Sequence, residues 1–215
     1  MAMKLISKSE EKIILRAEIP VSLANAVRRS INYIPVMAID SLELTKNDSA
    51  LYDEIIAHRM GFVPLKNEKL KLPKECGCEK DDGCGKCSMK FKLSASGPCT
   101  VYSTELSPKG NVVYKMPIAL LDKDQELEFV AIARMGQGIV HAKFSPGLIY
   151  YRYSEDLEKE SEEDFKKIVE ESKKNEEKEI TMVIESWGQM PAKEIFIQAT
   201  DVLQDELKSL AKAVK

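Results

Sequence analysis

Residues 66–90 interrupt the hydrophobic pattern of this chain more sharply than any other segment. They are mostly Lys, Glu, Gly and Cys, and they include four of the five cysteines of the 215-residue sequence. A segment with so few apolar residues cannot hold its shape by burying side chains, so it needs another constraint. The chain as a whole is that of a globular protein, since 44% of its residues are hydrophobic.

The cysteines of this segment lie in the sequence CGCEKDDGCGKC, with the spacing C-x-C-x5-C-x2-C. Zn²⁺ prefers four tetrahedral ligands, and a C-x2-C pair turns two thiolates toward one ion. The glycines between the cysteines give the backbone the freedom that such turns require. The spacing does not match the common iron–sulfur runs. We therefore predict a structural zinc site, with two disulfides or partly metallated thiols as the alternative, on four residues: Cys76, Cys78, Cys84 and Cys87.

Strand and helix patterns frame this segment at both ends of the chain. A strand over residues 12–18 precedes a helix over 22–33, and a strand over 180–188 precedes a helix from residue 190 onward. A short helix is expected within 49–65, and a charged surface helix over about 154–179. Further strands are expected at 36–47, 90–96, 99–104, 127–136 and 147–153.

These patterns predict an α+β fold with two domains. One is discontinuous and contains a sheet plus helices from both chain ends, residues 1–44 and 149–215. The other is a mainly β insert over residues 45–148, and it carries the cysteine-rich loop 66–90.

The sequence offers no catalytic constellation. It has only two histidines, His58 and His141, and neither belongs to an H-x-x-H or H-E-x-x-H pattern. It has no nucleophile elbow and no glycine-rich phosphate loop. A zinc site closed by four thiolates leaves no position for water, so it does not catalyse hydrolysis. A zinc enzyme is therefore disfavoured, and we expect no catalytic residue in this chain.

Net charge and hydropathy limit which other classes of function are possible. The formal net charge of −3 disfavours a protein that coats nucleic acid, and no sequence-specific DNA binding is expected. No apolar run approaches the ~18 residues of a membrane-spanning helix. The first residues, MAMKLISKSEEK, lack the apolar core of a signal peptide. We expect a cytoplasmic protein, and a zinc-stapled module that binds nucleic acid or protein stays an alternative.

Two helices carry candidate contact surfaces. In the first, Arg28 and Arg29 lie beside Asn25 and away from the apolar side, where they either stay solvated or meet a partner. In the second, apolar residues recur at intervals of three and four along one face. This stripe packs either on its own sheet or on a partner, and it consists of Phe196, Ala199, Leu203, Leu207, Leu210 and Val214.

Three longer motifs add a family resemblance. They are IPVSLANAVRRSINYIPVMAID, LYDEIIAHRMGFVPL and HAKFSPGLIYYRY. They resemble the α-like RNA polymerase subunits, which comprise the archaeal D-type subunit, the third-largest subunit of eukaryotic RNA polymerase II and the N-terminal domain of bacterial α. The archaeal form is the one that the sequence resembles most. The cysteine cluster is similar to the zinc loop of the eukaryotic homologue.

The resemblance implies a non-catalytic scaffold subunit in transcription. The discontinuous domain would be a dimerisation domain that pairs with a small α-like subunit, L. The heterodimer would assemble the large catalytic subunits and two small zinc subunits, N and P, of a DNA-directed RNA polymerase. Only the whole polymerase would be a nucleotidyltransferase. The resemblance places the interface on Asn25, Ala26, Arg28, Arg29, Ile34 and Pro35, together with Phe196, Ala199, Leu203, Leu207 and Leu210 of the terminal helix.

The sequence departs from the family pattern at two places. Many archaeal members carry an iron–sulfur insert late in the chain, but residues 154–179 here contain no cysteine, so we expect no such cluster. Five residues separate the two halves of the cysteine motif, more than in the eukaryotic loop.

Overall fold

The computed structural model describes residues 3–68, 70–77, 83–153 and 179–214. These residues form two compact units. The terminal unit lies within residues 1–34 and 146–215, and the middle unit is the continuous segment 35–145. The two ends of the chain therefore build one unit together.

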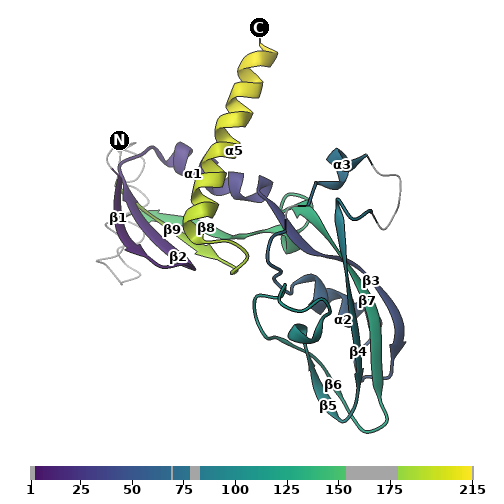
Figure 1. The fold of residues 1–215 in the computed structure, drawn as a ribbon. Coiled ribbons are helices and arrows are strands. Elements are labelled where there is room, and N and C mark those ends of the chain that lie inside the picture. The colour runs from purple at the N-terminus through teal and green to yellow at the C-terminus, as the bar shows by residue number, and fades with distance from the viewer. Residues whose placement is uncertain (1–2, 69, 78–82, 154–178, 215) are drawn as a thin grey trace. The chain divides into compact units, whose positions relative to one another are not determined.

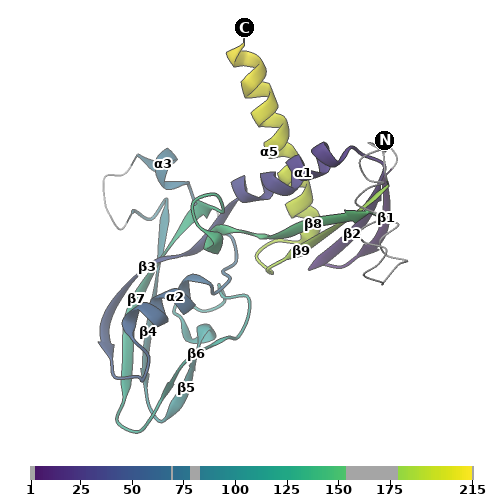
Figure 2. The same ribbon diagram turned by 180° about the vertical axis from the view of Figure 1, so that it is seen from behind.

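The terminal unit contains a four-stranded antiparallel sheet with the order β1-β2-β9-β8. The strands span Met3–Lys8 (β1), Lys12–Ala17 (β2), Gly147–Tyr153 (β8) and Ile180–Ser186 (β9). Two helices, Val21–Ser30 (α1) and Ala192–Ala213 (α5), pack on each other and on this sheet, and the 3₁₀ turn Ile31–Tyr33 (η1) follows α1 (Figures 1 and 2).

Alternating side chains explain how β2 meets the helices. Ile13, Leu15 and Ala17 are buried, whereas Lys12 is exposed on the opposite face. Residues of β9 that pair with the buried positions, including Ile184, are themselves buried. This period of two gives the sheet one apolar face, and burial of that face is the main force that holds the helices against it.

The middle unit contains a three-stranded antiparallel sheet, β3-β7-β4, and a two-stranded one, β5-β6. The strands are Pro35–Asn47 (β3), Ser88–Ser96 (β4), Cys99–Tyr102 (β5), Pro117–Leu121 (β6) and Glu126–Gln137 (β7). The helices are Asp53–Gly61 (α2) and the single turn Pro73–Cys76 (α3), with 3₁₀ turns at Ser103–Glu105 (η2) and Ala142–Phe144 (η3).

The middle unit has a core of its own. Its buried cluster extends from Met37 to Met135, and Phe91 and Phe129 are its largest side chains. Every buried member of this cluster lies within residues 37–135, so this unit buries its apolar surface without using the chain ends.

The predicted α+β class is confirmed, and ten of the elements lie where the sequence pattern placed them. The structure adds two strands, β1 and β6. β1 is an edge strand whose six residues are all exposed, so it lacks the alternation that reveals a half-buried strand. β6 has only five residues and begins with Pro117, which weakens its strand signal. The predicted charged helix over 154–179 lies outside the described residues, except for Glu179.

The sequence boundaries of the compact units differ from those of the expected domains. The breaks fall after residues 34 and 145, whereas the sequence pattern placed them after 44 and 148. The reason is that residues 35–47 form one strand, which pairs with β7 from Pro35–Gln137 to Asn47–Leu127. Among the described ranges, no helix is both long and apolar enough to span a membrane.

Candidate metal centre and contact surfaces

Three of the four clustered cysteines come together in the middle unit. The Sγ atoms of Cys76 and Cys84 are 3.5 Å apart, and those of Cys84 and Cys87 are 3.9 Å apart. All three sulfur atoms lie within 4.8 Å of one another. Cys78, the fourth predicted ligand, lies outside the described residues.

The local backbone explains this convergence. Cys76 ends α3, and Gly77 follows with a φ of +63°, the left-handed conformation that commonly ends a helix. At the other half of the motif, the backbone N–H groups of Cys87 and Ser88 both donate to the Cys84 carbonyl oxygen at 2.9 Å. The Cys84 N–H donates to the Cys87 sulfur at 3.3 Å. This tight turn directs the C-x2-C pair toward Cys76.

The sulfur separations fit a tetrahedral metal. With Zn–S bonds of about 2.3 Å, two thiolates on one zinc lie about 3.8 Å apart. A disulfide would instead bring its sulfurs to about 2.05 Å. The Cys76–Cys84 and Cys84–Cys87 pairs are therefore not disulfides in this structure, and the three residues can hold a metal ion.

Cys99 stands apart from this group. It lies in β5, and its thiol donates to the Ser96 carbonyl oxygen at 3.5 Å. Cys99 is half-buried.

The arginine-bearing helix α1 has an ordered polar side. Asn25 Oδ1 accepts hydrogen bonds from Arg28 Nε at 3.0 Å and from Arg28 Nη2 at 2.8 Å, which fix the guanidinium group. Arg29 is exposed, whereas Ala26 is half-buried. Two further residues of the predicted interface lie deeper: Ile34 is fully buried, and Pro35 is half-buried at the start of β3. Ile34 therefore supports the fold and is not on the surface of this chain.

The apolar stripe of α5 divides into two halves. Ile195 and Ala199 are fully buried, and Phe196 and Leu203 are half-buried. From Gln204 to Val214, every residue is exposed. The exposed fractions in this second half are 58% for Leu207, 63% for Leu210 and 82% for Val214. The first half thus packs on its own sheet, and the described chain leaves the second half uncovered (Figure 1).

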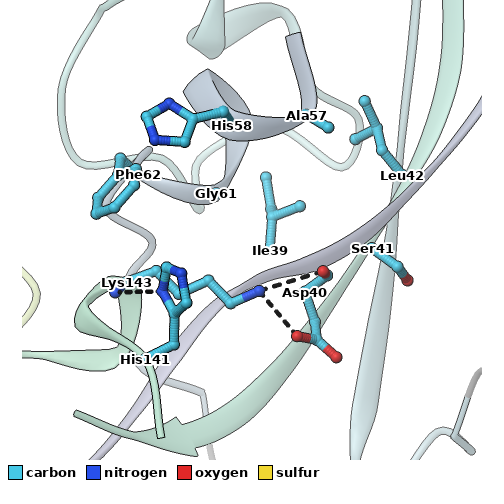
Figure 3. A pocket seen from close by; sticks show the side chains of 10 residues that line it. All are labelled: Ile39, Asp40, Ser41, Leu42, Ala57, His58, Gly61, Phe62, His141 and Lys143. Atoms are coloured by element: carbon cyan, nitrogen blue, oxygen red, sulfur yellow. Dashed lines mark hydrogen bonds and ion pairs between the residues drawn. The ribbon is translucent and has the colours of Figure 1, made fainter. Parts of the chain in front are cut away.

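A pocket of about 160 Å³ opens in the middle unit, and it brings the two histidines near each other (Figure 3). The ring centroid of Phe62 lies 5.1 Å from that of His58 and 6.1 Å from that of His141. Two further lining residues form an ion pair, in which Lys143 Nζ lies 2.8 Å from Asp40 Oδ1. The sequence motifs contained all of these residues, but none of their spacings indicated that they line one pocket.

Comparisons with known proteins agree with this architecture. The family described as "RNA polymerase Rpb3/RpoA insert domain" matches residues 31–150. The "DNA-directed RNA polymerase subunit Rpo3" of Methanocaldococcus jannaschii is 32% identical over 209 residues, which cover 95% of this chain and 91% of that protein. The Rpo3 subunit of Pyrococcus horikoshii is 40% identical over 156 residues, covering 70% of this chain and 58% of the relative.

A eukaryotic relative shows the same likeness. The "DNA-directed RNA polymerase II subunit rpb3" of Dictyostelium discoideum is 33% identical over 163 residues, or 66% of this chain and 53% of that protein. The match thus spans little more than half the length of some relatives and nearly all of another. The fold and these matches define an α-like polymerase subunit. The chain belongs to the Rpb3/RpoA family of RNA polymerase subunits, together with the archaeal Rpo3 proteins.

Proposed function

We propose that this chain is the D-type subunit of an archaeal DNA-directed RNA polymerase and acts as its non-catalytic assembly scaffold. The uncovered half of α5 is the observation that carries the proposal, because it presents an apolar stripe without a cover in the described chain. The names of the relatives support the polymerase setting. Nucleotide transfer would belong to the large catalytic subunits, and this chain would work with them in the cytoplasm.

The partner of the α5 stripe would be the small α-like subunit, L. Leu207, Leu210 and Val214 project on one side of the helix at intervals of three and four, which suits the face of a second helix. Full burial of one such side chain contributes about 1.5–3 kcal/mol. Three of them supply a substantial part of the free energy that a stable heterodimer needs.

The polar side of α1 would serve the larger assembly. Arg28, held by Asn25, and the exposed Arg29 offer charged donors in a fixed position. Arginine is enriched at protein interfaces, where its planar group binds carboxylates with two parallel hydrogen bonds. This surface would contact the large subunits, and the small zinc subunits N and P would join the same platform.

Co-expression with the small L subunit from the same organism tests the scaffold proposal. We expect a stable 1:1 complex in size-exclusion chromatography with light scattering. A chain that stays separate from L at micromolar concentrations of both proteins would overturn the proposal.

We also propose that Cys76, Cys84 and Cys87 hold a structural zinc ion, with Cys78 as the fourth ligand. The three sulfur positions support tetrahedral coordination. Bound zinc would fix the core-poor segment around α3 and the start of β4. Purified protein should contain one zinc per chain, and cobalt substitution should give the absorption of a tetrahedral thiolate site. The proposal would be contradicted if the purified chain contained no metal and carried two disulfides, whether or not reductant was present during purification.

A further inference from the structure

The three cysteines that meet in the middle unit differ in how far solvent reaches them. Cys76 and Cys84 are half-buried, whereas Cys87 is only 1% exposed. The two half-buried residues also have the closer sulfur atoms, at 3.5 Å, against 3.9 Å between Cys84 and Cys87. We infer that Cys76 and Cys84 form an oxidisable pair: hydrogen peroxide joins them in a disulfide, which releases the metal of the proposed zinc site on which this inference rests.

Exposure decides which sulfur atoms an oxidant reaches first. A metal-bound cysteine is a thiolate, and oxidation of thiolates follows their accessibility. The Cys87 sulfur accepts the backbone N–H of Cys84 at 3.3 Å, and a Cβ added to Gly83 would lie only 3.0 Å from it. An oxygen atom on Cys87 would therefore need space that its surroundings do not offer. Peroxide reacts at Cys76 or Cys84 instead.

The reaction balances with peroxide as its oxidant. One thiolate of the pair attacks a peroxide oxygen, the O–O bond breaks, and a sulfenic acid and a hydroxide ion form. The second thiolate attacks the sulfenic sulfur, forms the S–S bond and displaces a second hydroxide ion. Each sulfur loses one electron overall, and the peroxide oxygens gain both. Because thiolates are the metal ligands, the disulfide removes two ligands from the ion.

The backbone around Cys76 permits the small movement that a disulfide requires. The sulfur atoms must approach from 3.5 Å to about 2.05 Å. Cys76 ends the single turn α3, and no heavy atom lies within 4 Å of the Cβ position of the following Gly77. Cys84 is held more firmly, since its carbonyl oxygen accepts the N–H groups of Cys87 and Ser88 at 2.9 Å. Cys76 therefore moves toward Cys84.

The segment keeps the two cysteines together after the metal leaves. The Lys71 N–H donates to the Lys86 carbonyl oxygen at 2.9 Å, so the chain before α3 is bonded to the chain after Cys84. The Cys76–Cys84 disulfide links the same two parts of the segment that the metal links. Oxidation thus exchanges one crosslink for another, and a thiol reductant restores the ligands.

Peroxide treatment of the purified full chain tests the inference. Zinc is measured first, its release is followed with a colorimetric chelator, and the products are alkylated and digested with trypsin. Cleavage after Lys74, Lys80 and Lys86 separates Cys84 from Cys87. Tandem mass spectrometry then distinguishes Cys76 from Cys78. We expect the Cys76–Cys84 disulfide as the main product, with about one zinc ion released per disulfide, and renewed zinc binding after dithiothreitol.

A metal-free sample separates this inference from the zinc proposal. It is prepared with a chelator under reductant and oxidised in parallel, and the same disulfide should form. A chain that contains no zinc at the outset contradicts the zinc proposal, while the cysteine pairing in the metal-free sample still decides the inference.

Variants of the chain locate the reaction. Cys87→Ser and Cys84→Ser each remove one thiol of the C-x2-C pair, but only Cys84→Ser should abolish the disulfide to Cys76. Cys99→Ser is the control, since Cys99 is also half-buried but lies apart from the cluster in β5, and its loss should change neither disulfide nor zinc release.

Several products would overturn the inference. They are a disulfide between Cys84 and Cys87 or one that includes Cys78 as the main product, oxidation to sulfinic or sulfonic acids without a disulfide, and retention of zinc by oxidised chains. Loss of the Cys76–Cys84 disulfide in the Cys87 or Cys99 variant would overturn it as well.

Discussion

Gly83 precedes the C-x2-C turn with a φ of +76°, a backbone conformation that side chains with a Cβ rarely adopt. An added Cβ would lie 2.9 Å from Ser88 Cβ and 3.0 Å from Cys87 Sγ. The glycine is therefore required at this position both by its backbone conformation and by its neighbours. Gly85, only two residues later, has no heavy atom within 4 Å of the Cβ position and no such constraint.

We predict that Gly83→Ala weakens zinc binding by about 5- to 30-fold, because a non-glycine residue in this conformation costs about 1–2 kcal/mol. A competition titration with a zinc chelator measures the affinity. Gly85→Ala is the control and should bind zinc like the parent chain. If the Gly83 variant bound zinc as tightly as the parent chain, the backbone conformation at Gly83 would not contribute to zinc binding.

Gly136 in β7 is a second position where a side chain would not fit without movement of its neighbours. A Cβ there would lie 2.6 Å from Cγ of the buried Phe144, which belongs to η3. We predict that Gly136→Ala destabilises the protein by about 1–3 kcal/mol, because the ring must move within a packed core. Urea denaturation measures the free energy of unfolding. Gly61→Ala serves as the control, since its Cβ would make only ordinary contacts at 3.8 Å. An unchanged stability of the Gly136 variant would mean that Phe144 adjusts freely.

At the scale of elements, α5 has two different roles along one helix. Its first half buries Ile195 and Ala199 against the terminal unit, and its second half is exposed. We predict that Ile195→Ala lowers the free energy of unfolding by about 2–5 kcal/mol, through lost burial and the cavity left behind. Leu207→Ala should change it by less than about 0.5 kcal/mol. Similar losses in both variants, measured by urea denaturation, would show that the second half also packs within this chain.

The second half of α5 also gives a direct test of pairing. Leu207→Glu should abolish the complex with the L subunit, because a charge would enter an apolar seam. Ser209→Glu is the matched control, since residue 209 lies about 200° around the helix from Leu207. Size-exclusion chromatography after co-expression reads out the complex. Survival of pairing in the Leu207 variant would place the seam elsewhere.

At the scale of the whole molecule, the two units differ in how the chain builds them. The middle unit is one continuous segment with its own buried cluster, whereas the terminal unit joins both chain ends through the β2–β9 pairing. We predict that a fragment of residues 35–145 folds alone and unfolds cooperatively in urea. Residues 1–34 alone should stay unfolded, since their strand β2 lacks β9. Circular dichroism and NMR chemical-shift dispersion show whether each fragment is folded. An unfolded 35–145 fragment would contradict this prediction.

Local patterns in the sequence already contained much of the fold. Strand-like apolar runs identified β2, β3 and β9, and spacing by three and four identified α1 and α5. The C-x2-C spacing indicated that Cys84 and Cys87 lie in one tight turn. These features depend on neighbours along the chain. The exposed strand β1 and the short strand β6 carry no such pattern, so only their pairing with β2 and β5 reveals them.

The sequence by itself determined the α+β class, because local patterns of apolar residues set the strands and helices. Only the tertiary structure decided where the units divide, since residues 35–47 form one strand that pairs with β7 along its whole length. It also decided how much of the α5 stripe its own sheet covers, because periodicity marks an apolar face without showing what lies against it. The same holds for the pocket at Phe62, His58 and His141: residues about 80 positions apart become neighbours only when β3, α2 and η3 pack together.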